Sequence, residues 1–367
     1  MHMTSTIDKK PNLTLDPGKL SGHAVRIATE LNLHQSYSRA MKGLPEHFES
    51  ARLWYFLYVC DHHFSIAYGR PPVIHENNII TNHVQFLQLP HVTQSDQRLH
   101  SQVAVFIILT DIYNKFGPDV EDNLTEDDLI HVRHFNLRLD QWRSDWQERL
   151  AANPHIGTYP SKGVSLHYFY ARLQLNSLSL RGLKQEQDNL STSRRELASI
   201  AISSALMILR MTLEEPDITG AIVGVPLYLH TMITYATVFL LKVQQKWGGA
   251  QIGIDLLQIQ DLVSRVINLL QEAKASQRHL AHHIAVGLSK MLERSTTVEH
   301  QDSSSRHNVH QNEASASASI YEYRAPGNGS TVFDHPSLEL YSDIAGYGQD
   351  FPFGFFDVLS STIPEWK

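Results

Sequence analysis

Apolar residues recur at three- and four-residue intervals along most of the chain, which is the spacing of one face of an α-helix. The first series is Leu20, Ala24, Ile27, Ala28 and Leu31. Further series predict helices over residues 46–68, 97–116, 125–150, 162–183, 193–213, 226–247, 254–273 and 277–294. Strict alternation of apolar and polar residues, the mark of a strand, is not evident. The pattern therefore predicts an all-α fold of about nine helices.

Two predicted helix ends carry clear local signals. The helix over 46–68 should stop at Gly69-Arg70-Pro71-Pro72, because glycine suits a left-handed C-cap and proline cannot continue a helix. The helix over 125–150 should begin at Thr125 as N-cap, followed by three acidic residues where the helix dipole favours negative charge.

One stretch, residues 218–241, contains no Asp, Glu, Lys or Arg and is long enough to cross a bilayer. It also contains Pro226, His230 and several hydroxylated side chains, and acidic residues precede it. We interpret it as a buried central helix and expect no membrane partner. A membrane span is the alternative.

Composition divides the chain into four parts. Residues 1–17 are an N-terminal linker, and residues 18–294 are the all-α domain. Residues 295–324 are rich in Ser, Ala and His and predict a disordered linker. Residues 325–367 contain six acidic residues and eight aromatic residues, and no Lys or Arg occurs before the last residue, Lys367.

The acidic and aromatic composition of residues 325–367 is typical of activation segments that fold onto coactivators. Docking onto the helical body is the alternative. The residues expected to act are Asp343, Asp350, Phe351, Phe353, Phe355, Phe356, Asp357 and Leu359.

The chain of 367 residues has a net charge of −7, which is not the electrostatic footprint of a module that binds duplex DNA. Its single cysteine, Cys60, excludes a multi-thiolate zinc site within these residues and is expected to lie in the core. The histidine pairs His279/His283 and His131/His134 have no supporting ligand at suitable spacing. We therefore expect no metal site and no catalytic residues.

One enzyme-like pattern remains. Asp188, Thr192 and Glu196 are similar to the second magnesium motif of all-α class I terpene synthases. Residues at four-residue spacing on a helix can face one magnesium ion. The upstream Asp-rich motif of those enzymes is not found, so a terpene synthase-like enzyme is kept only as an alternative function.

The strongest signal comes from two linked stretches, LSGHAVRIATELNLH at residues 20–34 and ARLWYFLYVCDHHFSIAYGRPP at residues 51–72. Their order and spacing resemble the middle homology domain of fungal Zn(2)-Cys(6) transcription factors, closest to the subgroup similar to weak-acid-response regulators. The motif residues carried over are Arg26, Arg52, Trp54, Asp61, Gly69, Arg70, Pro71 and Pro72. We expect Asp61, Arg26 and Arg70 to form a buried polar cluster that fixes the turn.

The resemblance implies a nuclear transcription regulator with an all-α regulatory domain. It also implies coactivators, a homo- or heterodimer with a zinc-cluster factor, and a small-molecule inducer. Tyr58, Phe106, Tyr168, Tyr170 and Tyr228 are aromatic candidates for a pocket, although each is more readily explained as core.

The chain departs from the family pattern in three ways. The six-cysteine zinc cluster is absent, so no zinc cofactor is expected and DNA contact would need a missing segment or a partner. Helices upstream of Leu20 are absent, so we expect an N-terminally truncated domain. His62 stands where the family commonly has Arg. A co-regulator or inhibitory partner that does not bind DNA is therefore a second alternative function.

Overall fold

The computed structural model of the chain describes residues 17–67, 69–117, 124–154, 157–183, 190–247 and 255–308. Within these residues every regular element is a helix, apart from one β-bridge between Asn153 and Gly157. The long helices are α1 (Pro17–Glu30), α3 (Phe48–Ala67), α6 (Gln94–Phe116), α7 (Glu126–Arg149), α8 (Tyr159–Ser177), α9 (Thr192–Glu214), α11 (Leu227–Trp247), α12 (Leu256–Gln271) and α13 (Leu280–Asn308). Each of them corresponds to a helix predicted from the apolar spacing, which confirms the all-α fold.

Short helical turns join the long helices. They are α2 (Ser36–Ala40), α4 (Asn78–Thr81), α5 (His83–Phe86), α10 (Pro216–Thr219) and the 3₁₀ turns η1 (Leu33–Gln35), η2 (Pro45–His47) and η3 (Leu178–Leu180). The predicted N-cap at Thr125 is confirmed, because Thr125 and Asp128 close a reciprocal capping box at the start of α7. Helix α6 begins at Gln94, earlier than expected, because Thr93 and Asp96 close a second capping box there.

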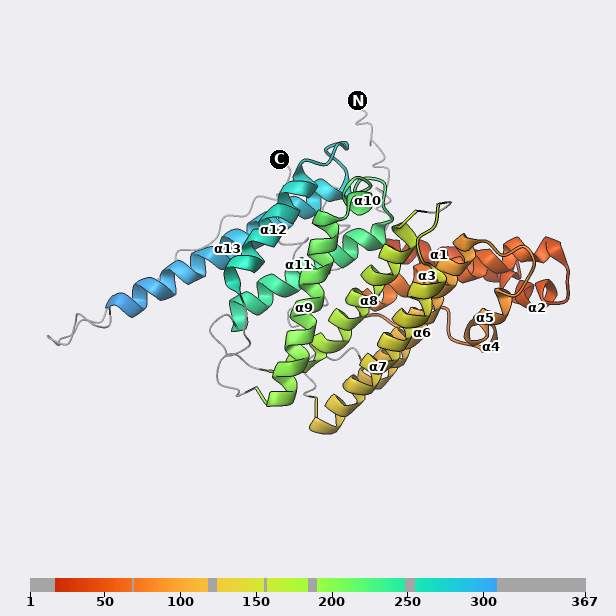
Figure 1. Cartoon of the computed structure of the whole chain (residues 1–367), viewed down its shortest axis with the longest axis horizontal. Coiled ribbons are helices and arrows are strands. Elements are labelled where there is room, and N and C mark those ends of the chain that lie inside the picture. Colours follow the sequence, from red (N-terminus) through yellow and green to blue (C-terminus); the bar gives the residue numbers. More distant parts are fainter. Residues whose placement is uncertain are drawn as a thin grey trace, which may run out of the picture.

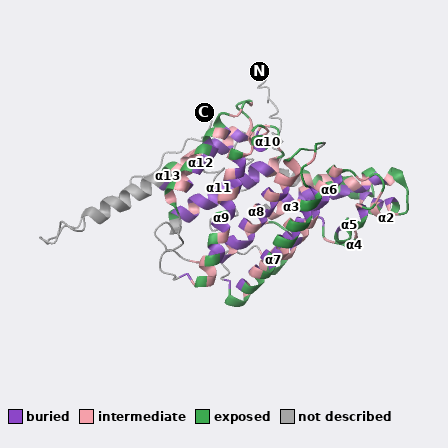
Figure 2. Cartoon of the chain, in the orientation of Figure 1, coloured by how far each residue is buried: buried purple, intermediate pink, exposed green. Residues whose placement is uncertain are grey.

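Buried side chains form two apolar cores along the elongated body (Figure 1). The N-terminal core is built from α1 to α8 together with Leu197 of α9, and the C-terminal core from α8 to α13. Figure 2 shows long runs of buried residues along α9 and α11. Burial of this apolar area supplies the main driving force for folding.

Helix α8 belongs to both cores because it has two apolar faces. Val164, Tyr168, Ala171 and Leu175 face the N-terminal core at helical spacing. Leu166, Tyr170 and Leu173 face the C-terminal core. One helix therefore joins the two halves of the domain.

The predicted buried central helix is confirmed as α11, whose residues 229–241 are all buried. It begins at Leu227 rather than further upstream, because α10 and a turn occupy residues 216–226. One helix in the described residues, α9, is long and apolar enough to cross a membrane by length and composition alone. Its Ala198, Ala201 and Leu209 are buried in the C-terminal core, so α9 is a core helix here.

Helix α13 runs on to Asn308, past residue 294, so the segment expected to be a linker begins with helical residues. The rest of that segment lies outside the described residues, as do residues 1–16 and the proposed activation tail. Asp343, Asp350, Phe351, Phe353, Phe355, Phe356, Asp357 and Leu359 therefore stay a prediction.

Candidate functional site

The motif over residues 51–72 is organised around Asp61, which is 1% exposed. Its Oδ2 accepts hydrogen bonds from the backbone N–H groups of Val73 at 2.7 Å and Ile74 at 2.9 Å. These bonds hold the chain that follows the Pro71-Pro72 turn against α3. Asp61 thus fixes the turn, as expected, but it does so through backbone donors.

The arginines expected beside Asp61 lie elsewhere or at the surface. The Arg26 side chain is 80% exposed and pairs with Glu30 at 3.7 Å on the outer side of α1. Arg70 is exposed. The predicted buried cluster of Asp61, Arg26 and Arg70 is therefore wrong, because both arginines are exposed, where their charges stay hydrated, and two backbone N–H groups bind the buried carboxylate.

The turn after α3 depends on Gly69, which has a φ of 64°. The Gly69 N–H bonds to the Ile66 carbonyl at 3.1 Å, and the Arg70 N–H bonds to the Ser65 carbonyl at 2.8 Å. This is the left-handed helix ending predicted from the sequence.

Replacement of Gly69 by alanine is expected to lower the free energy of unfolding by about 1 kcal/mol, because a β-carbon strains a left-handed residue. Urea unfolding followed by circular dichroism would measure the loss. Gly22→Ala is a matched control, since Gly22 lies within helix α1 and a β-carbon there meets no atom within 4 Å. An equal or larger loss for Gly22→Ala would contradict the explanation.

Arg52 joins the beginning of α3 to the beginning of α6. Its Nε and Nη2 donate to the two carboxylate oxygens of Asp96 at 2.6 and 2.9 Å, and its Nη1 donates to Glu49 at 2.8 Å. Asp96 is 1% exposed and also closes the α6 capping box with Thr93. Burial would raise the pKa of Asp96, but the hydrogen bonds from Arg52 and Thr93 lower it. Arg52 therefore holds the start of α3 against the start of α6 and has a structural role.

Other motif residues serve the N-terminal core. Trp54 is buried beside His34. The Tyr58 hydroxyl donates to Glu76 at 2.8 Å, and His62, which replaces the family's usual Arg, contacts the same carboxylate oxygen at 3.1 Å. Burial alone would raise the pKa of Glu76, yet these hydrogen bonds lower it to about 2. This polar cluster holds the loop after α3.

A half-open groove of about 920 Å³ lies between α3, α6 and the start of α11. Two large apolar side chains stand in it with much of their surface in solvent, Leu53 at 47% and Phe56 at 53% exposed. Its lining also includes Glu49, Arg52, Cys60, His63, Asp96, Arg98, Leu99, Gln102, Leu227 and Tyr228. The volume falls in the range usual for small-ligand sites.

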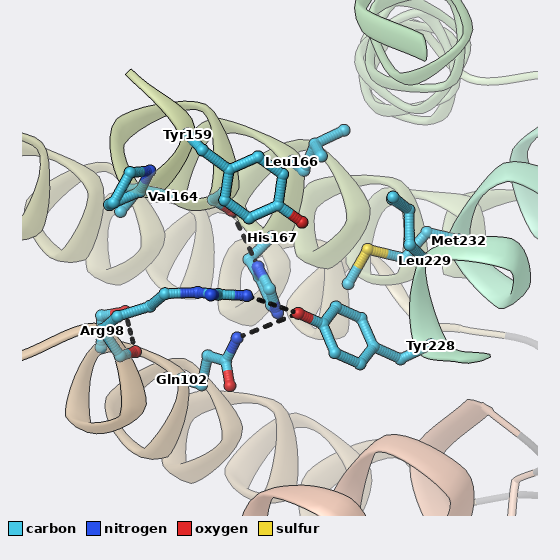
Figure 3. Close-up of a pocket in the computed structure, with 12 residues that line it drawn as sticks. Arg98, Gln102, Tyr159, Val164, Leu166, His167, Tyr228, Leu229 and Met232 are labelled. Atoms are coloured by element: carbon cyan, nitrogen blue, oxygen red, sulfur yellow. Dashed lines mark hydrogen bonds between the residues drawn. The ribbon is translucent and has the colours of Figure 1, made fainter. Parts of the chain in front are cut away.

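Tyr228 separates this groove from a small inner pocket of about 10 Å³, which is about the room of one water molecule. In Figure 3, Arg98 and Gln102 of α6 point at the Tyr228 hydroxyl. Their side-chain nitrogens donate to it at 3.2 and 3.5 Å. His167 of α8 lies beside this group and bonds to the Gly163 carbonyl through Nδ1 at 2.8 Å.

Two buried histidines flank Tyr228. The His63 ring stacks on it with centroids 4.3 Å apart, and the His167 ring lies 5.4 Å from that of His63. Burial lowers the pKa of His63 well below its usual range and that of His167 to about 4. Neither Nε2 atom has a hydrogen-bond partner among the described residues, an arrangement that costs free energy unless water or a ligand supplies one.

The aromatic candidates predicted from sequence separate clearly. Tyr58, Phe106, Tyr168 and Tyr170 are buried in the cores, whereas Tyr228 lines the groove. The sequence reading missed Arg98, Gln102, His63 and His167. No local pattern marks them, because Arg98 and Tyr228 are 130 positions apart. Cys60, expected in the core, is intermediate in exposure and lines the groove.

Nothing in the described part of the chain supports the magnesium alternative. Glu196 of the suspected motif pairs with Arg133 at 3.0 Å, and Asp188 lies outside the described residues. Among the described residues there is no group of three or more His, Cys, Asp or Glu side chains placed to hold a metal ion.

Comparison with known proteins decides the family. The family model described as the middle domain of the transcriptional activator of proteases prtT matches residues 1–295. The chain belongs to this family. The match to the prtT middle-domain family covers every described helix through α12 and about half of α13, and so it includes the whole groove.

Two curated relatives of the prtT middle domain are transcription proteins of fungi. The chain is 57% identical over 284 residues to the transcriptional activator of proteases prtT of Emericella nidulans, which covers 75% of this chain and 43% of that protein. It is 36% identical over 58 residues to the transcription factor TAC1 of Candida albicans, covering 16% of this chain and 6% of that protein. The chain thus spans less than half the length of the curated relatives it matches. No solved structure matched it.

Proposed function

We propose that this chain is the regulatory middle portion of a nuclear transcription regulator and that it is not an enzyme. The observation that carries the proposal is the 57% identity to a transcriptional activator over 284 residues, which spans most of the described helical body. The single cysteine means that these 367 residues cannot form a six-cysteine zinc cluster. DNA contact would therefore come from another segment of the protein or from a zinc-cluster partner.

The domain would act by presenting or withholding the acidic-aromatic segment at residues 325–367. That segment would recruit coactivators through its alternating acidic and aromatic side chains. The two-core body, joined through α8, would serve as the platform from which the segment is presented.

The whole chain, fused to an unrelated DNA-binding domain, is expected to activate a reporter gene. Joint replacement of Phe351, Phe353, Phe355 and Phe356 by alanine should remove most of this activity, because aromatic side chains supply much of the contact energy in such complexes. Reporter output would be measured against the amount of fusion protein.

The matched control replaces Phe333, which lies outside the densest aromatic run, by alanine. Reporter silence with the unaltered fusion present at normal levels would overturn the activation claim. That result would favour the alternative of an inhibitory partner that does not bind DNA.

A further inference from the structure

We propose that the groove between α3, α6 and α11 binds short apolar peptides through their free C-terminal carboxylate. The inference rests on the proposed function, because it supplies the signal to which the regulator would respond. The recognising groups are Arg98 for the carboxylate, Leu53 and Phe56 for apolar side chains, and the exposed carboxylate of Glu49 for the N-terminal ammonium.

Arg98 is the group that selects an anion. It lines both the groove and the inner pocket and is partly buried. Its contacts are the Tyr228 hydroxyl at 3.2 Å and the face of the Tyr159 ring at 5.1 Å. Among the described residues no carboxylate pairs with it. A partly buried guanidinium with only neutral neighbours favours a ligand that brings a carboxylate.

The walls of the groove select apolar side chains. Leu53 and Phe56 are unusually exposed for their size, and Leu99 and Leu227 continue the same surface. Covering such surface releases about 25 cal/mol per Å² of apolar area. A ligand with two or three apolar side chains would cover this apolar surface and gain the corresponding free energy of binding. A single small acid would leave most of the surface exposed to water.

The groove also contains an accessible negative charge. Two carboxylates, Glu49 and Asp96, share the one guanidinium of Arg52, and Asp96 is buried. The Glu49 side chain is 74% exposed, so it can reach a ligand. The groove therefore offers the carboxylate of Glu49 on α3 and the guanidinium of Arg98 on α6, which matches the two charges of a zwitterionic peptide.

His63 contributes a nearly buried ring to the wall of the groove. It is 6% exposed and lines the groove, but its Nε2 is itself buried, so a ligand would contact the ring and not this atom. The inner pocket beyond Tyr228 is too small for more than about one water, so the ligand would lie in the groove itself.

The class of reaction that would supply this ligand is the hydrolysis of proteins. The relative from Emericella nidulans is described as an activator of proteases. Proteases release peptides with a new free carboxylate, which is the group that Arg98 is placed to bind. A regulator with the role described for that relative would then sense a product of the proteases it activates.

Cys60 provides a direct probe of the groove in the unaltered protein, because it is the single cysteine of the chain and lines the groove. Burial, followed by the neighbouring Asp61, raises the pKa of the Cys60 thiol to about 11, so alkylation is slow enough to time. Trileucine at about ten times its Kd should slow alkylation about tenfold and raise the unfolding temperature. Trileucine amide, which lacks the carboxylate, should bind about tenfold more weakly or worse.

Two variants test whether Arg98 binds the carboxylate of the peptide. Arg98→Gln should abolish the preference for trileucine over its amide, whereas Arg26→Gln, on the exposed face of α1, should leave it unchanged. If trileucine gives no protection of Cys60, or if the amide protects equally well, the inference is wrong.

The comparison of acid and amide uses the unaltered protein, so it holds even if Arg98→Gln misfolds. None of these measurements depends on transcription, so a silent reporter with intact peptide binding would overturn only the proposed function.

Discussion

Replacement of Asp61 by alanine is expected to lower the free energy of unfolding by about 1–3 kcal/mol. The variant removes the acceptor of the Val73 and Ile74 N–H groups, and the Ile74 N–H is left buried without a partner, whereas Val73 is 54% exposed. An unsatisfied buried donor costs about 1–3 kcal/mol. Denaturant unfolding at neutral pH, followed by circular dichroism, would measure the change.

Two further variants test this explanation. Asp61→Asn keeps one side-chain carbonyl oxygen as acceptor and should recover part of the loss. Asp127→Ala removes an exposed acid from the first turn of α7 and should cost less than about 1 kcal/mol. If Asp61→Ala were no more harmful than Asp127→Ala, the turn would be held by other contacts.

Acidification is expected to destabilise the domain strongly between about pH 6.5 and pH 4. Burial lowers the pKa of His83, His167 and His230 to about 4 and that of His100 to about 3. In the unfolded chain these rings take up protons near pH 6.5, whereas the folded protein resists protonation until about pH 4. Stability is therefore fully present above the unfolded pKa and is lost as the pH falls. At neutral pH each of these rings contributes on the order of 1–3 kcal/mol to the free energy of unfolding, and this contribution is lost on acidification.

Urea unfolding at a series of pH values would reveal the loss, and His63→Phe tests its origin. His63 has only ring contacts with Tyr228, Phe106 and His167 at its faces and edges, so phenylalanine can fill the same space. The variant should show a shallower acid decline because one titrating ring is gone. His75→Phe, at an exposed position, is the control. If the free energy of unfolding fell with pH equally steeply in both variants and in the unaltered protein, the buried-histidine explanation would be refuted.

The sequence was sufficient for the fold because the apolar period extends over each long helix. The nine predicted helices are present, and their ends at Thr125 and Gly69 follow local capping rules. The short elements α4, α5 and α10 escaped prediction because four residues are too few to show a period. They form where chain direction and neighbouring helices leave room for a single turn.

The candidate site was much harder to predict. Asp61 was expected to attract arginines, since opposite charges are the simplest partners to suggest from sequence. In the folded chain, residues 73 and 74 instead run back along α3, and their backbone N–H groups donate to the Asp61 carboxylate. The groove joins α6 to the start of α11 through Arg98 and Tyr228, and such long-range pairs leave no trace in a single sequence.

The two faces of α8 also set an order for biosynthesis. The N-terminal core needs Val164, Tyr168, Ala171 and Leu175, so the first seven helices emerge from the ribosome with that core still open. Until α8 follows, they remain a partly covered apolar assembly, the kind of intermediate that is prone to aggregation. Helix α8 then supplies its four side chains to this core, which Leu197 of α9 completes, and presents Leu166, Tyr170 and Leu173 as the surface on which the C-terminal core assembles.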